Sequence, residues 1–180
     1  MKPIFITGLY RSGTTLISRM LNNHSQLAVT YDSVHFMRFS YGKYDPISTA
    51  KNYRSLVLEI KERIEKRWNM HLEEQSVLKK LEAKKRIEYA DVYDALMTTL
   101  LLKGSGKKRW GEKTNVCWGK IPAFLDMFPQ GKVIHIIRDP RDVLVSFKHF
   151  TEETGLKYLD ARIQRFDRIG VNEIHKIIFI

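Results

Sequence analysis

The sequence has a single cysteine, Cys117, and no long apolar run. One cysteine cannot form a disulfide within the chain, and no group of cysteines and histidines has the spacing of metal ligands, so neither disulfides nor a structural metal are expected to hold the fold. No segment approaches the roughly 18 apolar residues of a membrane-spanning helix. The first residues also lack the apolar region and small-residue cleavage site of a signal peptide. These absences predict a cytoplasmic protein in a reducing compartment, with no membrane span and no bound metal.

Acidic residues are scarce relative to basic ones. The chain has 20 Asp and Glu against 31 Lys and Arg, which leaves a formal net charge of +11. Such a charge favours an anionic partner, but it does not distinguish nucleic acid, lipid, glycan and nucleotide. Hydrophobic residues make up 43% of the 180 residues, which excludes a disordered chain and predicts one folded domain.

Short apolar runs alternate with segments of helical spacing. Strands are predicted at 4–7, 27–30, 109–111 and 133–137. Helices are predicted at 14–22, over an insert of about 51–103, at 117–128 and at 141–150. The polar, aromatic segment 31–46 is predicted to be a loop. Strands that alternate with helices predict an α/β fold with a parallel sheet.

The run 133–137 is the clearest strand of the sequence. Its nearly continuous apolar residues predict a buried parallel strand with both faces covered, and His135 is expected to pack inside it. The helix that follows is expected to turn Val143, Leu144 and Phe147 inward. Because ligands bind at the carboxyl ends of strands in open α/β sheets, the residues directly after this strand are candidates for a site.

The segment Gly8–Thr15 (GLYRSGTT) joins the first strand to the first helix and fits the G-x-x-x-x-G frame of a phosphate-binding loop. Backbone N–H groups and the start of the helix can bind an anion there. The position that holds lysine in nucleoside triphosphatases is Thr14, and the cation of the loop is Arg11, so an ATP or GTP hydrolase is disfavoured. A tight turn before a capped helix is the structural alternative.

Arg138 and Ser146 form a second candidate site. Arg138 follows the clearest strand, and Ser146 lies eight residues further along, in the predicted helix. A guanidinium fork and a hydroxyl group can bind one phosphate together. The structural alternative is an ion-pair cluster of Arg138 with Asp139 and Asp142.

Together, these segments resemble the sulfotransferase family that uses 3′-phosphoadenosine 5′-phosphosulfate (PAPS). The stretch FITGLYRSGTTLISRMLNNHSQL is similar to the family's phosphosulfate loop and helix, in the arginine form of the carbohydrate and tyrosylprotein branches. The stretch KVIHIIRDPRDVLVSF is similar to its 3′-phosphate motif, and GEKT at Gly111–Thr114 also resembles this group. The resemblance spans residues 4 to about 150. It implies a P-loop NTPase-like, three-layer α/β/α fold with a central parallel sheet and a helical insert.

The resemblance also implies roles for single residues. Those that would bind the 5′-phosphosulfate of PAPS are Arg11, Ser12, Gly13, Thr14 and Thr15. Those that would bind its 3′-phosphate are Arg138 and Ser146. Arg11 and Lys113 would stabilise the charge that builds on the leaving phosphate. PAPS would be the co-substrate, and no divalent ion would be needed.

The group that takes the proton of the acceptor is a separate question. In the tyrosylprotein branch the base is a glutamate, and the same interval from the loop arginine falls on Asp32 in this sequence. In the small-molecule branch a histidine follows a Lys-Thr pair, but here that position is Asn115. His35 is a further candidate, three residues after Asp32. The predicted catalytic residues are therefore Asp32, Arg11 and Lys113.

The predicted activity is sulfuryl transfer from PAPS to an unidentified hydroxyl or amine acceptor, such as a sugar, a lipid, a phenol or a protein tyrosine. Two other functions stay open at this point: a P-loop kinase-like phosphotransferase, and a non-catalytic basic module that binds a nucleotide or another anion. No specific nucleic acid partner is expected. Variable loops build acceptor pockets in such folds, so the sequence does not identify the acceptor.

We expect residues 1–180 to form a single sulfotransferase-like domain. Its last residues, Ile177–Ile180, are an apolar tetrad without a following turn. Such a tetrad either docks in the sheet as a terminal strand or belongs to a domain that continues, because an exposed edge of this kind favours aggregation. The domain is predicted to be incomplete at its C-terminus.

Overall fold

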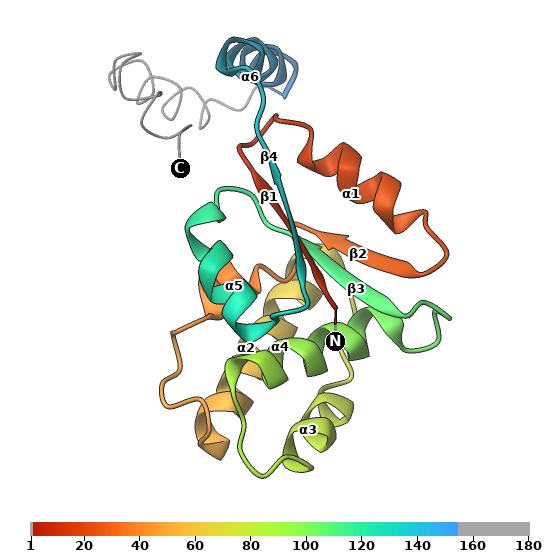
Figure 1. Ribbon diagram of the computed structural model, residues 1–180, viewed down its shortest axis with the longest axis vertical. Coiled ribbons are helices and arrows are strands. Elements are labelled where there is room, and N and C mark those ends of the chain that lie inside the picture. The colour runs from red at the N-terminus through yellow and green to blue at the C-terminus, as the bar shows by residue number, and fades with distance from the viewer. Residues whose placement is uncertain (1, 155–180) are drawn as a thin grey trace.

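The fold is a parallel sheet of four strands in a computed structural model that describes residues 2–154 (Figure 1). The strands, in spatial order, are β2 (Leu27–Tyr31), β3 (Arg109–Lys113), β1 (Ile4–Gly8) and β4 (Lys132–Ile136). All three neighbouring pairs are parallel, so the carboxyl ends of the strands meet at one edge of the sheet. The predicted α/β class with a central parallel sheet is confirmed.

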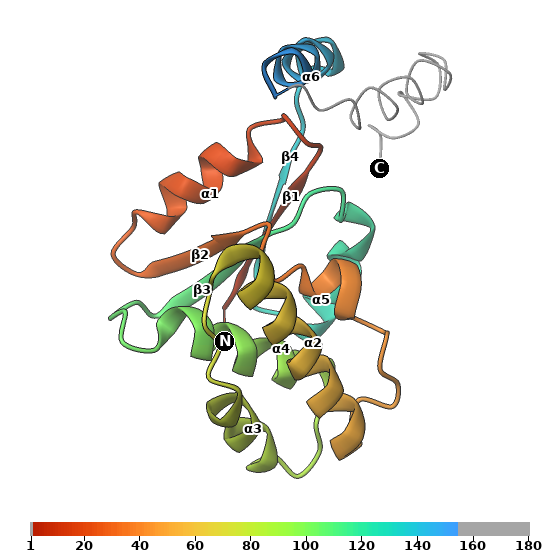
Figure 2. The ribbon, with the colours of Figure 1, turned by 180° about the vertical axis from the view of Figure 1, so that it is seen from behind.

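Helices cover both faces of the sheet (Figures 1 and 2). On one face lies α1 (Thr14–Asn22), and at the end of β4 lies α6 (Pro140–Thr154). The helices on the other face are α2 (Ala50–Trp68), α3 (Glu74–Glu82), α4 (Tyr89–Met97) and α5 (Ile121–Met127). The part of the chain that the structure describes also has three short helical turns: Phe36–Ser40, Thr98–Leu102 and Trp118–Lys120.

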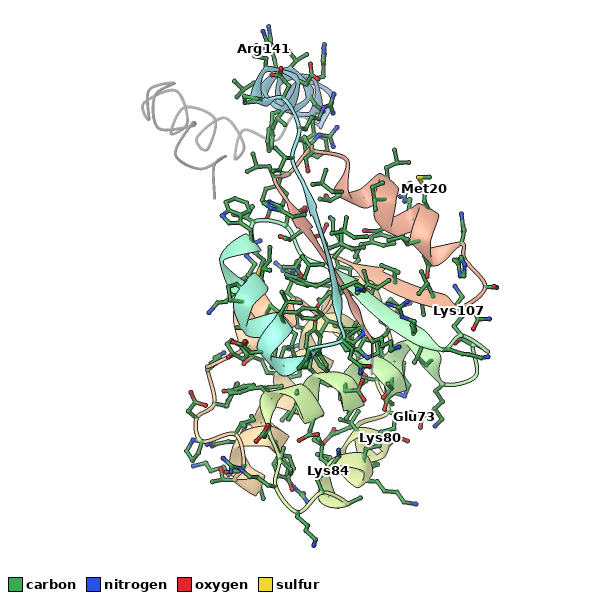
Figure 3. All side chains as sticks on the ribbon, in the orientation of Figure 1. Met20, Glu73, Lys80, Lys84, Lys107 and Arg141 are labelled. Carbon is green, nitrogen blue, oxygen red and sulfur yellow. The ribbon has the colours of Figure 1, made fainter. Side chains whose placement is uncertain are left out.

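Alternate residues of the strands build two separate cores, because successive side chains of a strand point to opposite faces. Phe5 and Trp110 face the helical insert and join the large core that α2, α3 and α4 complete. Ile4, Ile6 and their neighbours form a smaller core, and Leu21 of α1 packs against it. On the outer side of α1, Leu16 and Met20 are exposed, and Figure 3 shows Met20 pointing away from the sheet.

Gly8 ends β1 at a point where no side chain fits. A Cβ atom there would lie 2.6 Å from the carbonyl oxygen of Ile136 on β4 and 3.0 Å from side-chain atoms of Ser12 and Thr14. Glycine therefore lets the chain leave β1 while β4 stays close beside it. This close approach brings the loop after β1 next to the residues that follow β4.

The strand predicted at 133–137 exists, but the prediction that both of its faces are buried is wrong. Within residues 2–154, β4 is one of the two edge strands of the sheet, and none of its residues is fully buried. His135 is exposed and stacks on Trp118 with ring centroids 6.0 Å apart, so it is not a packed core histidine. In α6, Val143 is buried as expected, but Leu144 is 40% exposed.

Other predicted elements need smaller corrections. The strand predicted at 109–111 extends to Lys113 and lies inside the sheet, between β2 and β1. The helix predicted at 117–128 begins later, at Ile121, after a 3-10 turn. The loop predicted at 31–46 contains the π-helical turn Phe36–Ser40. The apolar tetrad at the end of the sequence lies outside the described residues.

Two absences can be stated for residues 2–154. None of their helices combines the length and the apolarity needed to cross a membrane. They also contain no group of three or more His, Cys, Asp or Glu side chains arranged to hold a metal ion.

Candidate functional site

The loop between β1 and α1 has two residues in the left-handed region. Arg11 has φ 65° and Gly13 has φ 100°, and Gly13 occupies the N-cap position of α1. No side chain of the described residues caps this helix, and its first turn has no acidic residue. Its first N–H groups are therefore left for a ligand, and the helix dipole favours an anionic one.

Two segments that are far apart in the sequence line one pocket at the carboxyl ends of β1 and β4. Its volume is about 220 Å³, and its lining residues are Arg11, Gly13, Thr14, Thr15, Arg138 and Ser146. The guanidinium Nε of Arg11 donates a hydrogen bond to Ser146 Oγ at 3.0 Å. Arg138 donates another to the carbonyl oxygen of Arg11 at 3.1 Å. The lining thus has two guanidinium groups and no carboxylate, which suits a highly anionic ligand.

The acidic residues beside Arg138 do not close it off from this pocket. Asp139 accepts hydrogen bonds from Arg141, at 2.6 Å from the guanidinium Nη2, and these bonds lower the pKa of Asp139 to about 2. Arg138 itself contacts Asp142 at 3.6 Å, and both side chains are largely exposed. The ion-pair alternative therefore holds in part: Arg138 pairs with Asp142, whereas Asp139 pairs with Arg141, and Arg138 also lines the pocket.

Two hydroxyl groups of the loop are already engaged within the protein. Ser12 Oγ donates to the carbonyl oxygen of Leu9 at 2.7 Å, and Thr14 Oγ1 donates to Asn115 Oδ1 at 2.8 Å. Both residues are buried. The hydroxyl groups of both residues are engaged within the protein, although Thr14 also lines the pocket, whereas Thr15 lines it with a partly exposed side chain.

Asp32 and Lys113 form an ion pair beside the loop. Asp32 directly follows β2 and has φ 53°, and Lys113 is the last residue of β3. The Lys113 side chain is 1% exposed and that of Asp32 is 30% exposed. Lys113 is absent from the pocket lining, and its ammonium group pairs with Asp32. Asp32 keeps an open side toward solvent.

Glu112 is a buried carboxyl group within the segment GEKT, and its sequence position alone predicted no separate role for it. It accepts hydrogen bonds from the backbone N–H of His35 at 2.5 Å and from the hydroxyl group of Tyr93. Burial raises the pKa of Glu112 to about 7. Burial also lowers the pKa of His35 to about 4, and no described residue bonds to its buried Nδ1 atom. The turn after Asp32 is therefore anchored through its backbone to β3, with a neutral imidazole beside it.

The pKa of Glu112 predicts how stability depends on pH. Because the folded protein holds this proton up to about pH 7 and the unfolded chain only up to about 4.5, stability falls as pH rises through that window. At 1.36 kcal/mol per pKa unit, the loss is about 3 kcal/mol. Glu112→Gln keeps a similar shape without the charge and is expected to escape this loss. The measurement is the free energy of unfolding in urea at several pH values from 4 to 8. The difference between Glu112→Gln and the wild type is expected to move in favour of the variant as pH rises. If this difference stayed constant, the raised pKa of Glu112 would be contradicted.

Several aromatic residues near the site belong to the core. Phe36 stacks on Tyr93 with ring centroids 4.1 Å apart, and Trp110 is fully buried with its Nε1 bonded to Asp94 at 2.8 Å. Cys117 is buried, and burial raises the pKa of its thiol to about 11. A thiol with this pKa stays protonated near neutral pH, which argues against a cysteine nucleophile.

Comparison with known proteins identifies the family of the chain. A family model described as "Sulfotransferase family" matches residues 3–176, nearly the whole chain. A search of curated proteins gives no match. Proteins of this family transfer sulfuryl groups from a donor to an acceptor, and the match extends across both segments that line the pocket. The chain therefore belongs to the sulfotransferase family.

Proposed function

We propose that this protein transfers a sulfuryl group from PAPS to a hydroxyl or amine acceptor. The observation that carries the proposal is a pocket that Arg11 of the first loop lines together with Arg138 and Ser146 of the segment after β4. PAPS has a 5′-phosphosulfate and a separate 3′-phosphate, so a protein that binds it needs two anion sites side by side. The two segments supply these sites from opposite ends of the described chain.

The donor roles follow from this arrangement. Arg11, Thr15 and the first N–H groups of α1 bind the 5′-phosphosulfate, with Ser12, Gly13 and Thr14 holding the loop in shape. Arg138 and Ser146 bind the 3′-phosphate. The Arg11–Ser146 hydrogen bond of 3.0 Å is the contact that the incoming phosphate groups replace. At about 220 Å³, the pocket is smaller than the roughly 300–1,000 Å³ of whole small-molecule sites, so it accounts for the phosphate groups and not for the nucleoside.

The transfer needs alignment, charge stabilisation and a proton acceptor. The acceptor oxygen or nitrogen forms a bond to sulfur while the bond from sulfur to the 5′-phosphate oxygen breaks, and the bisphosphate leaves with one more negative charge. Arg11 stabilises that charge. Asp32 takes the proton of the acceptor, and Lys113 keeps the carboxylate in position through the ion pair. Fixing the two reactants in line supplies a further part of the rate.

Binding of the product nucleotide tests the proposal without knowledge of the acceptor. Adenosine 3′,5′-bisphosphate at about 100 times its dissociation constant stabilises the folded state by about 2.7 kcal/mol, which for a chain of this size raises the melting temperature by about 5–10 °C. The measurement is a thermal unfolding curve with and without this nucleotide. Adenosine 5′-monophosphate at the same concentration serves as the control, and a smaller shift is expected because it lacks the 3′-phosphate.

A different pattern would overturn the assignment. If ATP with magnesium raised the melting temperature and adenosine 3′,5′-bisphosphate did not, the protein would be a kinase-like phosphotransferase. If neither nucleotide had an effect, the pocket would not be a nucleotide site.

A further inference from the structure

Asn115 has a buried side chain that contacts both the loop between β1 and α1 and the carboxylate of Asp32. It is 3% exposed and lies two residues after the end of β3. Its Oδ1 atom accepts the hydrogen bond from Thr14 Oγ1 at 2.8 Å, and its Nδ2 atom lies 3.4 Å from Asp32 Oδ1. One amide group therefore connects the donor loop with the carboxylate that is proposed to take the proton.

The backbone around Asn115 is tied to β1 on both sides. The N–H of Thr114 donates to the carbonyl oxygen of Ile6, and the N–H of Val116 donates to that of Gly8, both at 2.9 Å. The segment thus continues the pairing of β3 with β1 beyond the last strand residue. Because these bonds fix the backbone at positions 114 and 116, the side chain of Asn115 is held beneath the first loop.

The direction of the hydrogen bonds follows from the chemistry of the partners. An ionised carboxylate can only accept, so Asp32 must face the amide nitrogen of Asn115 and not its oxygen. The amide oxygen is then free to accept the single hydroxyl proton of Thr14. The other carboxylate oxygen of Asp32, Oδ2, is bound by Lys113. This leaves Oδ1, whose contact with Asn115 is long, with room to accept a proton from a substrate.

We infer that Asn115 is a positioning residue, which keeps the Asp32 carboxylate aligned with the donor held by the first loop. The inference rests on the proposed function. Asn115 itself does not take part in proton transfer, because its amide group is not protonated near neutral pH. It sets where Oδ1 of Asp32 lies relative to the sulfur atom of the donor, and a small displacement of a catalytic group is costly for the rate.

Two substitutions test this role. The measured rate is the release of adenosine 3′,5′-bisphosphate from PAPS with water as the acceptor, so no acceptor has to be identified. Asn115→Ala is expected to lower kcat about 10–100-fold and to leave the KM for PAPS within about threefold. We expect kcat to change more than KM because the substitution removes the alignment of Asp32 but leaves the arginines of the pocket in place.

Asn115→Asp gives a second readout through its pH profile. The new carboxylate lies against Asp32, so one of the two is expected to hold a proton to higher pH than an isolated aspartic acid. When residue 115 is protonated, it can donate to Asp32 and accept from Thr14, as the amide does. The kcat of this variant is therefore expected to approach the wild-type value as pH falls from 8 to 6, and the ratio to wild type is compared at each pH.

Asn22→Ala is the matched control. The side chain of Asn22 accepts a hydrogen bond from the backbone N–H of Val29 at 2.9 Å, and within residues 2–154 no hydrogen bond joins this side chain to the first loop or to Asp32. This variant is expected to lose stability and to keep the wild-type kcat. The inference is overturned if Asn115→Ala keeps the wild-type kcat, or if KM rises as much as kcat falls. A wild-type protein that does not bind the bisphosphate would overturn the proposed function and the inference with it. A wild-type protein that releases the bisphosphate from PAPS, beside an Asn115→Ala variant with the same kcat, would overturn the inference alone.

Discussion

Arg11→Ala is expected to reduce the rate of sulfuryl transfer about 10²–10³-fold. Arg11 is the cation of the first loop, and its guanidinium reaches across the pocket to Ser146. Removing one preorganised donor from a developing negative charge costs about 2.7–4 kcal/mol of transition-state stabilisation. The measurement is kcat for bisphosphate release from PAPS. The KM for PAPS is expected to change less, because Arg138 and the start of α1 still bind the nucleotide.

Arg19→Ala is the control for this substitution. Arg19 lies in the last turn of α1, the helix that follows the loop of Arg11, and its guanidinium lies 5.9 Å from the ring centroid of Tyr31, outside the pocket. The loss of its charge changes the net charge of the protein by the same amount. Equal effects of the two substitutions would mean that Arg11 acts only through the general field of the protein.

Arg138→Ala is expected to remove the preference for a nucleotide with a 3′-phosphate. A hydrogen bond to a charged group contributes about 1.5–3 kcal/mol, so the affinity for adenosine 3′,5′-bisphosphate should fall about 10–100-fold. The affinity for adenosine 5′-monophosphate should stay nearly constant, because that nucleotide has no group at this position. Isothermal titration with both nucleotides measures the two affinities, and their ratio reports the preference.

Arg141→Ala is the matched control for Arg138. Arg141 is three residues further along, on the exposed side of α6, where it pairs with Asp139 and not with the pocket (Figure 3). This variant should bind both nucleotides like the wild type. If Arg138→Ala weakened the two nucleotides equally, Arg138 would bind a group common to both, and the 3′-phosphate assignment would be wrong.

The parts of the fold that the sequence predicted best depend on local patterns. The apolar run that forms β1, the glycine that ends it and the helix from Thr14 agree with the structure to within one residue. The position of β4 was predicted correctly, but its burial was not. An apolar run predicts a strand, but it does not show which neighbouring elements cover that strand. Leu144 shows the same limit, since helical spacing alone does not say which side of α6 packs against the rest of the protein.

The sequence predicted the glycine and arginine residues of the proposed site. It did not predict the buried polar residues, whose roles depend on how distant segments pack together. The sequence indicated both Arg11 and Arg138, and the structure brings them to one pocket. Glu112 and Asn115 were missed as functional groups. The signal available was the charged pair Glu112–Lys113 inside a short strand, where a buried charge requires partners. Those partners, Tyr93 and Asp32, come from distant segments and appear only in the folded chain.

The position of β1 in the sheet has a consequence for the order of folding. β1 pairs with Gly111–Lys113 of β3 on one side and with β4 on the other, although it is made first during synthesis. At about 5–20 residues per second, a ribosome needs about 5–20 seconds to add the hundred or so residues that separate β1 from β3. For that time the central strand has no partner. The helices of the insert can form from local contacts during this time. The strand β1, which precedes the loop of Arg11, is therefore made before β3 and β4 but pairs with them late.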